Sequence, residues 1–217
     1  EVRFREILED FRPDIVHIFG TEFPHALAMV RAFRKPERTL VGIQGLCFAC
    51  AEAYLADLPE YVVQRRTFRD VLKRDGILQQ QEKFRIRGER EKEVLKGVGH
   101  ITGRTDFDRT ETGKINPKAR YHFMDETMRT PFYEGEWKGE VCRNAGAGVC
   151  PAVESGAGRG RTGGKYGIFL SQGDYPLKGF HYVLQALPEV RKEFPQAYVM
   201  VAGNSVIEYR TWKARIT

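Results

Sequence analysis

A lysine at the entrance of a predicted helix has the clearest chemical use in this sequence. The stretch 171–179 (SQGDYPLKG) follows a short apolar run, precedes a helical pattern, and contains Gln172, Gly173 and Lys178. A strand, a turn of small residues and a helix present backbone N–H groups and the positive end of the helix dipole to a ligand. The lysine adds a full positive charge. This arrangement suits a diphosphate, although a Walker-type Gly-Lys-Ser/Thr ending is absent and a lone lysine near a helix start is usually just solvated.

Polar or acidic residues also follow each of four apolar runs earlier in the chain. Ligands of open parallel sheets bind beyond the carboxyl ends of the strands, so these residues are expected to line one cleft. The cleft candidates are His17, Glu22, Gln44, Gly45, Arg104, Thr105, Asp125 and Glu126. For any single position the alternative is that Asp, Thr or Gly merely caps the following helix. The four positions together favour the cleft.

The elements that must position these residues alternate between helix and strand. Apolar runs predict strands at 15–19, 39–43, 100–102, 119–124, 168–170 and 197–202. Helical patterns open the chain and recur at 25–33, 61–97, 126–133 and from Phe180, with Gly76 and Gly88 as expected breaks. Parallel strands need crossover helices, so the sequence predicts an α/β fold with parallel sheets.

Residues 144–165 differ from their neighbours on both sides. They are rich in Gly, Ala and Arg and show no periodicity, which predicts a linker without regular structure or an aberrant insertion. The expected domains are therefore 1–143 and 166–217. The chain opens inside a helical pattern without a methionine and stops without a capping signal. We therefore expect both domains to be incomplete.

Composition sets broad limits on partners and location. The 217 residues are 41 % apolar and 29 % charged, and no run is long enough to span a membrane, so the default location is cytoplasmic. The net charge of +6 suits anionic partners such as nucleic acid, acidic lipid headgroups or phosphate-bearing substrates. Cys47 and Cys50 are close, but Cys142 and Cys150 are too far apart for a second zinc-binding pair. We expect no metal and no cofactor.

The ordered series of motifs resembles bacterial family 4 glycosyltransferases of the GT-B fold. In the first half the resemblance rests on PDIVHIFGTE, GIQGL, HITGRTDFDR and YHFMDET, and these motifs are similar to the acceptor domain. In the second half it rests on the Lys178-Gly179 pair, on ALP and on FPQAYVMVAGN, which are similar to the start of the donor domain. Nearly all of the chain except 144–164 is covered. The resemblance implies two Rossmann-like domains.

The resemblance implies retaining transfer of a sugar from a nucleotide-diphosphate sugar to an acceptor, without a metal. Lys178 matches the lysine that stabilises the leaving diphosphate, while Gln172 occupies the position of the family's arginine. The positive charge at the diphosphate would then be weaker or would come from elsewhere, for example from Arg104. Gln44 stands where many relatives have a histidine. The family's glycine-rich loop and paired glutamates would lie before Glu1 and beyond Thr217. The chain alone is therefore expected to be inactive.

Other classes of function remain as alternatives. A non-catalytic α/β module that binds a nucleotide or another polyanion would also use a basic turn, and the neutral Gln44 and Gln172 favour it. Peripheral contact with a membrane stays open. A nucleic-acid-binding protein is disfavoured, because no recognisable module or interleaved surface aromatics accompany the positive charge.

Overall fold

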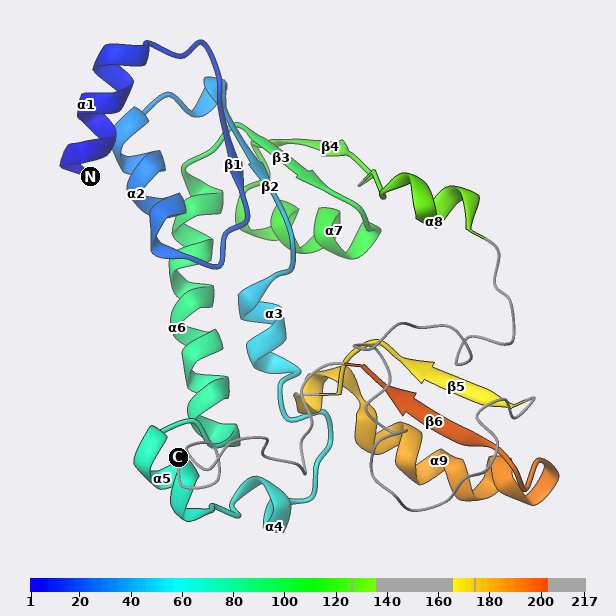
Figure 1. Cartoon of the computed structure of the whole chain (residues 1–217). Helices are drawn as coiled ribbons and strands as arrows, with labels where there is room; N and C mark the ends of the chain where they lie inside the picture. The colour runs from blue at the N-terminus through cyan, green and yellow to red at the C-terminus, as the bar shows by residue number, and fades with distance from the viewer. Residues whose placement is uncertain (126, 136–165, 174, 203–217) are drawn as a thin grey trace. The chain divides into compact units, whose positions relative to one another are not determined.

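Four short parallel strands form a sheet whose order follows the chain. The computed structural model describes residues 1–125, 127–135, 166–173 and 175–202. In the first part, the sheet order is β1-β2-β3-β4, and every neighbouring pair is parallel (Figure 1). The strands are β1 (Val16–Phe19), β2 (Thr39–Gly42), β3 (His100–Gly103) and β4 (Arg120–Phe123). The predicted α/β class with a parallel sheet is confirmed.

Helices connect the strands, as parallel pairing requires. Those of the first part of the chain are α1 (Val2–Phe11), α2 (Pro24–Phe33), η1 (Pro36–Arg38), α3 (Cys47–Glu52), α4 (Glu60–Val63), α5 (Phe68–Lys73), α6 (Ile77–Lys96) and α7 (Asp106–Ile115). Helix α8 (Thr130–Glu134) follows β4. Three of these elements, η1, α3 and α7, have no counterpart among the helices expected from the sequence.

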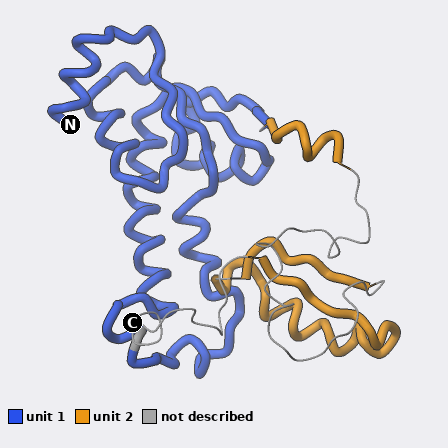
Figure 2. Tube along the Cα trace, in the orientation of Figure 1, with its two compact units in different colours: residues 1–126, 216–217 blue, residues 127–215 orange. Residues whose placement is uncertain are grey.

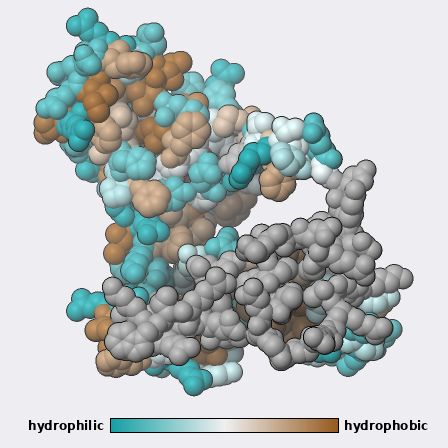
Figure 3. Space-filling view, in the orientation of Figure 1, coloured by the Kyte–Doolittle hydropathy of each residue, from teal (hydrophilic) through white to brown (hydrophobic). Residues whose placement is uncertain are grey.

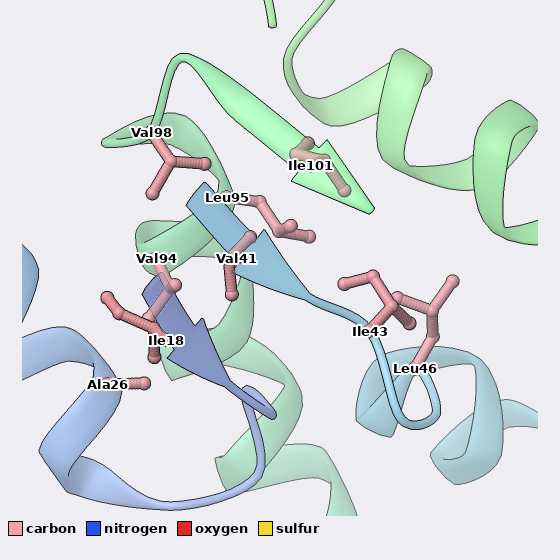
Figure 4. Close-up of a cluster of buried hydrophobic side chains, with 9 residues drawn as sticks. All are labelled: Ile18, Ala26, Val41, Ile43, Leu46, Val94, Leu95, Val98 and Ile101. Carbon is pink, nitrogen blue, oxygen red and sulfur yellow. The ribbon is translucent and has the colours of Figure 1, made fainter. Parts of the chain in front are cut away.

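The hydrophobic core lies between one face of the sheet and the helices α2 and α6. Alternate residues of the strands supply Ile18, Val41 and Ile101, which are at most 5 % exposed. Val94 and Leu95 of α6 pack against them, as Figure 4 shows. Because each crossover connects neighbouring parallel strands in the same direction, the right-handed rule places the connecting helices on one face.

The opposite face of the sheet is partly exposed in the described part of the chain. Ile15 and Phe19, which lie two residues to either side of His17 and share its face, are each 67 % exposed. Leu40 and His100 continue this face across β2 and β3, because Leu40 pairs in register with both His17 and His100. The face therefore carries both apolar and imidazole side chains.

Helix α6 runs unbroken through Gly88, which corrects the expected break at that residue. Gly88 is buried where α3 crosses α6, and an added Cβ atom would lie 2.6 Å from the Cα of Phe48. The glycine therefore serves close helix packing, a contact that local sequence does not reveal. The break expected at Gly76 is confirmed, since Gly76 is the N-cap of α6.

A second compact unit follows the first (Figure 2). The units divide at residue 126, so α8 belongs with the second. The second unit contains the parallel strands β5 (Gly167–Leu170) and β6 (Tyr198–Val201), the turn η3 (Pro176–Lys178) and the helix α9 (Phe180–Glu193). This is the strand–turn–helix–strand order that the sequence predicts. The boundary expected at 143 and the segment 144–165 lie outside the described residues.

No helix among the described residues combines the length and the apolar character needed to cross a membrane.

Candidate functional site at the strand ends

The carboxyl ends of the four strands meet at one edge of the sheet because the strands are parallel and in register. Phe19 pairs with Gly42, and Gly103 pairs with Phe123. Backbone hydrogen bonds continue past the strand ends, for example from the Met124 N–H to the Gly103 carbonyl at 3.0 Å. The residues that follow the strands are thereby held at the same edge.

Glu22, Gln44, Arg104 and Asp125 all follow the strands at this edge. Gln44 and Asp125 are exposed, whereas Glu22 and Arg104 are half-buried. The guanidinium of Arg104 donates a hydrogen bond to the backbone carbonyl of Gln44 at 3.2 Å and so joins the exits of β2 and β3. The edge combines carboxylate, amide and guanidinium groups, which can bind a polar ligand.

Glu22 and Asp125 follow the two outer strands of the sheet, β1 and β4. Neighbouring strands lie about 4.8 Å apart, which separates the ends of β1 and β4 by about 14 Å. Glu22 and Asp125 therefore follow the two strand ends that are farthest apart in this sheet.

Thr105 is engaged in capping α7. Its hydroxyl accepts a hydrogen bond from the Asp108 N–H at 3.1 Å, and the Asp108 carboxylate accepts one from the Thr105 N–H at 3.2 Å. This capping box satisfies N–H groups that the first turn of a helix leaves unpaired. The Thr105 side chain therefore caps the helix, which was the alternative to a place in the cleft. Gly45 has open space around it, so packing does not require a glycine there.

His17 does not lie at the edge with the other cleft candidates. It is the second residue of β1, which continues two residues farther to Phe19. Its side chain points to the face opposite Ile18, because successive residues of a strand alternate between faces. The Nε2 atom is buried there and has no hydrogen-bond partner among the described residues, and desolvation lowers the pKa of the imidazole. Glu126, the last candidate of this group, lies outside the described residues.

A buried glutamate on α6 organises the edge, and the sequence analysis did not identify it. Glu91 has an exposed fraction of 0 %. One carboxylate oxygen accepts a hydrogen bond from the hydroxyl of Thr21, in the segment that follows β1. The other accepts the backbone N–H of Phe48, at the start of α3, at 3.2 Å. A single carboxylate thus joins the exits of β1 and β2 to α6.

Burial changes the acid–base properties of this carboxylate. Desolvation raises the pKa of Glu91 to about 7, against the lowering effect of the hydrogen bonds from Thr21 and from the backbone of α3. Desolvation also raises the pKa of the neighbouring Cys47 thiol to about 12, with the charge of Glu91 as the next contribution. The thiol is therefore protonated at neutral pH and acts as a small buried side chain rather than a nucleophile.

The periodicity of α6 carries a signal for Glu91. Gly88, Glu91, Val94 and Leu95 are its buried residues, and their spacing of three and four residues places them on one face. A charged residue that falls on the apolar face of a helix, as Glu91 does, is the sequence pattern that indicates a buried charged group. It predicts burial but does not identify the partners, which come from loops far away in the sequence.

Two further histidines, His100 and His122, share with His17 the face of the sheet opposite the core. The Nδ1 atom of His100 lies 2.9 Å from the Nε2 atom of His122 on the neighbouring strand, so one ring donates a hydrogen bond to the other. Desolvation, with the charges of His100 and Arg120, lowers the pKa of His122. No group of three or more His, Cys, Asp or Glu residues in the described segments could hold a metal ion.

The second unit contains the basic turn predicted from the sequence. Lys178 ends η3, is exposed, and is separated from the first residue of α9 by Gly179 alone. Gly179 adopts a φ of 72° at the N-cap of α9, a left-handed conformation that favours glycine. Gln172 and Gly173 are half-buried after β5. An added Cβ on Gly173 would lie 2.9 Å from Val201 of β6, so packing alone explains this glycine.

The comparisons leave the family open. No known protein-family model, no curated protein and no solved structure matches the chain.

Proposed function

We propose that this chain takes part in retaining transfer of a sugar from a nucleotide-diphosphate sugar to an acceptor. In this proposal the two units are Rossmann-like domains of GT-B type, the turn before α9 holds the donor diphosphate, and the strand-end edge of the first unit faces the acceptor. The observation that carries the proposal is the exposed Lys178 at the N-terminus of the 14-residue helix α9.

Charge at this turn supports a diphosphate ligand. The N-terminus of α9 carries the positive end of a helix dipole, and Lys178 adds a full charge next to the N-cap residue Gly179. During sugar transfer negative charge develops on the leaving diphosphate, and a fixed cation at that position stabilises the transition state. Lys178 therefore contributes to donor binding and to departure of the diphosphate.

A second candidate is a non-catalytic module that binds a nucleotide or another polyanion. One observation favours it: Gln172 is neutral beside the proposed diphosphate site. Such a module would bind the phosphates without contacting the sugar.

The two candidates differ in which part of the ligand the protein contacts. We would mix the chain with UDP-glucose, GDP-mannose, ADP-glucose and inorganic triphosphate, and record saturation-transfer NMR spectra. Donor binding predicts transfer of saturation to the sugar and nucleotide protons of at least one nucleotide sugar. The polyanion module predicts signals from the nucleotide alone and equal competition by triphosphate.

Lys178→Ala tests the residue that carries the proposal. Loss of one charge-assisted contact should weaken binding of the responding nucleotide sugar by about tenfold or more. The matched control is Lys192→Ala at the other end of α9, where Lys192 pairs with Glu189 at 2.7 Å. Unchanged affinity in Lys178→Ala, or equal weakening in both variants, would overturn the assignment of the diphosphate to this turn.

A further inference from the structure

An exposed apolar stripe runs along α5 in the first unit. Phe68, Val71 and Leu72 are spaced by three and four residues, so they lie on one face of the helix. They are 78 %, 61 % and 60 % exposed, and none belongs to the hydrophobic core. Tyr61 on the adjacent α4 is 76 % exposed. Large apolar side chains gathered in this way mark an interaction surface rather than scattered surface residues.

Basic residues surround this stripe. Arg65, Arg66, Lys73 and Arg74 are all exposed. From Glu60 to Arg74 the sequence has five basic and only two acidic residues. Both acids are engaged locally: Glu60 accepts a hydrogen bond from Gln64 at 2.6 Å, and Asp70 accepts the Thr67 N–H in a capping box. The segment therefore has a formal net charge of +3, which suits an anionic partner.

We propose that the segment 60–74, with α4 and α5, docks on an anionic lipid bilayer surface. Its apolar side chains enter the boundary between headgroups and acyl chains, while its basic side chains bind anionic headgroups. Apolar and hydrophilic surfaces lie side by side over the part of the first unit that Figure 1 labels α5 (Figure 3). This inference goes beyond the proposed sugar transfer and does not depend on it.

Helix α1 shows that an exposed apolar residue alone does not identify such a surface. Phe11 of α1 is 77 % exposed, close to the value for Phe68. Residues 1–12, however, have four acidic and three basic side chains, so their charge would not favour an anionic bilayer. The segment 60–74 combines exposed aromatic side chains with an excess of positive charge, whereas residues 1–12 have no such excess. Phe11 therefore provides a matched control.

Sedimentation with vesicles tests the proposal directly. The whole chain is incubated with vesicles of phosphatidylcholine alone or of phosphatidylcholine and phosphatidylglycerol in equal parts, and the bound fraction is measured. We expect binding to the anionic vesicles only, weakening as salt is raised. Phe68→Ser should reduce the partition coefficient at least tenfold, and Phe11→Ser should leave it unchanged. Circular dichroism checks that both variants keep their helix content.

A pair of charge variants separates lipid attraction from net charge. Arg65→Gln with Arg66→Gln should weaken binding by about fivefold for each residue. Arg3→Gln with Arg109→Gln removes the same charge from exposed positions elsewhere and should have little effect. Equal effects of the two pairs would overturn the proposal in favour of diffuse attraction.

Three other outcomes would also overturn it. Equal binding to neutral vesicles would remove the role of the basic residues. Binding to double-stranded DNA that is as tight as vesicle binding and insensitive to Phe68→Ser would indicate a general polyanion surface. A dimer in light scattering that Phe68→Ser converts to a monomer, without vesicle binding, would assign the stripe to a second copy of the chain.

Discussion

The hydroxyl of Thr21 donates a hydrogen bond to the carboxylate of Glu91, which lies 70 residues farther along the chain. Both residues are buried, with exposed fractions of 1 % and 0 %. The same carboxylate accepts the N–H of Phe48, so it closes a connection between two strand exits and the long helix behind the sheet. The shape of the candidate edge in the first unit depends on this contact.

Protonation of Glu91 should make the stability of the chain depend on pH. Its pKa rises from 4.5 in the unfolded chain to about 7 in the folded one, so the folded state holds the proton more tightly. The contribution of this pKa difference to the free energy of unfolding is fully present below pH 4.5 and is lost as the pH rises to about 7. The shift corresponds to about 3 kcal/mol. Urea unfolding of the wild type and Glu91→Gln between pH 4.5 and 8 measures it.

The difference between the wild type and Glu91→Gln isolates this group, because all other titrations are shared. The substituted amide cannot ionise, so the free-energy difference between the two proteins should change across this range and level off above pH 7. The control is Glu89→Gln, an exposed carboxylate on the same helix. Parallel curves for the wild type and Glu91→Gln would show that the carboxylate does not titrate there.

Two glycines should respond in opposite directions to replacement by alanine. Gly88→Ala places a methyl group 2.6 Å from the backbone of Phe48, and the overpacking should destabilise the fold by about 2 kcal/mol. Gly113→Ala on α7 meets no atom within 4 Å and should stabilise by about 0.5–1 kcal/mol, because alanine is the better helix former. Urea unfolding of both variants provides the measurement. A stabilised Gly88→Ala protein would contradict the close crossing of α3 and α6.

Thr105 should behave as a capping residue. Thr105→Ala removes the acceptor for the Asp108 N–H and should cost about 1 kcal/mol of stability, while Thr105→Ser keeps the hydroxyl and most of the stability. Thr110→Ala, at an exposed position on the same helix, controls for loss of a threonine. Thermal unfolding measures all three. Equal stability of the alanine and serine variants would show that the cap contributes nothing.

Local sequence predicted the strands well and the short helices poorly. Strands such as β1 and β2 are apolar runs bounded by Gly and Pro, and both signals lie within a few residues. Helix α7 was missed although its start carries a readable Thr-x-x-Asp signal from Thr105 to Asp108. Helix α3 has only six residues and depends on contacts with α6, so its own sequence gives little indication of it.

The residues of the candidate site also include some that local sequence predicts and some that it does not. That Glu22, Gln44, Arg104 and Asp125 follow strand ends could be predicted, because parallel strands share one carboxyl edge. The prediction that His17 lies at the end of its strand was wrong, because β1 continues two residues beyond it. Glu91 was missed because its partners come from other segments of the chain. The diphosphate role of Lys178 remains a prediction.

The sequence by itself determined the order and type of the main elements, because apolar periodicity and Gly or Pro boundaries act within one element. Tertiary structure decided which polar groups are used internally and which stay available to a ligand. Thr21 and Glu91 are hydrogen-bonded to each other in the interior, whereas Gln44 and Lys178 remain exposed. Burial removes water from a polar group and requires a protein partner in its place, and that partner can be any distance away along the chain.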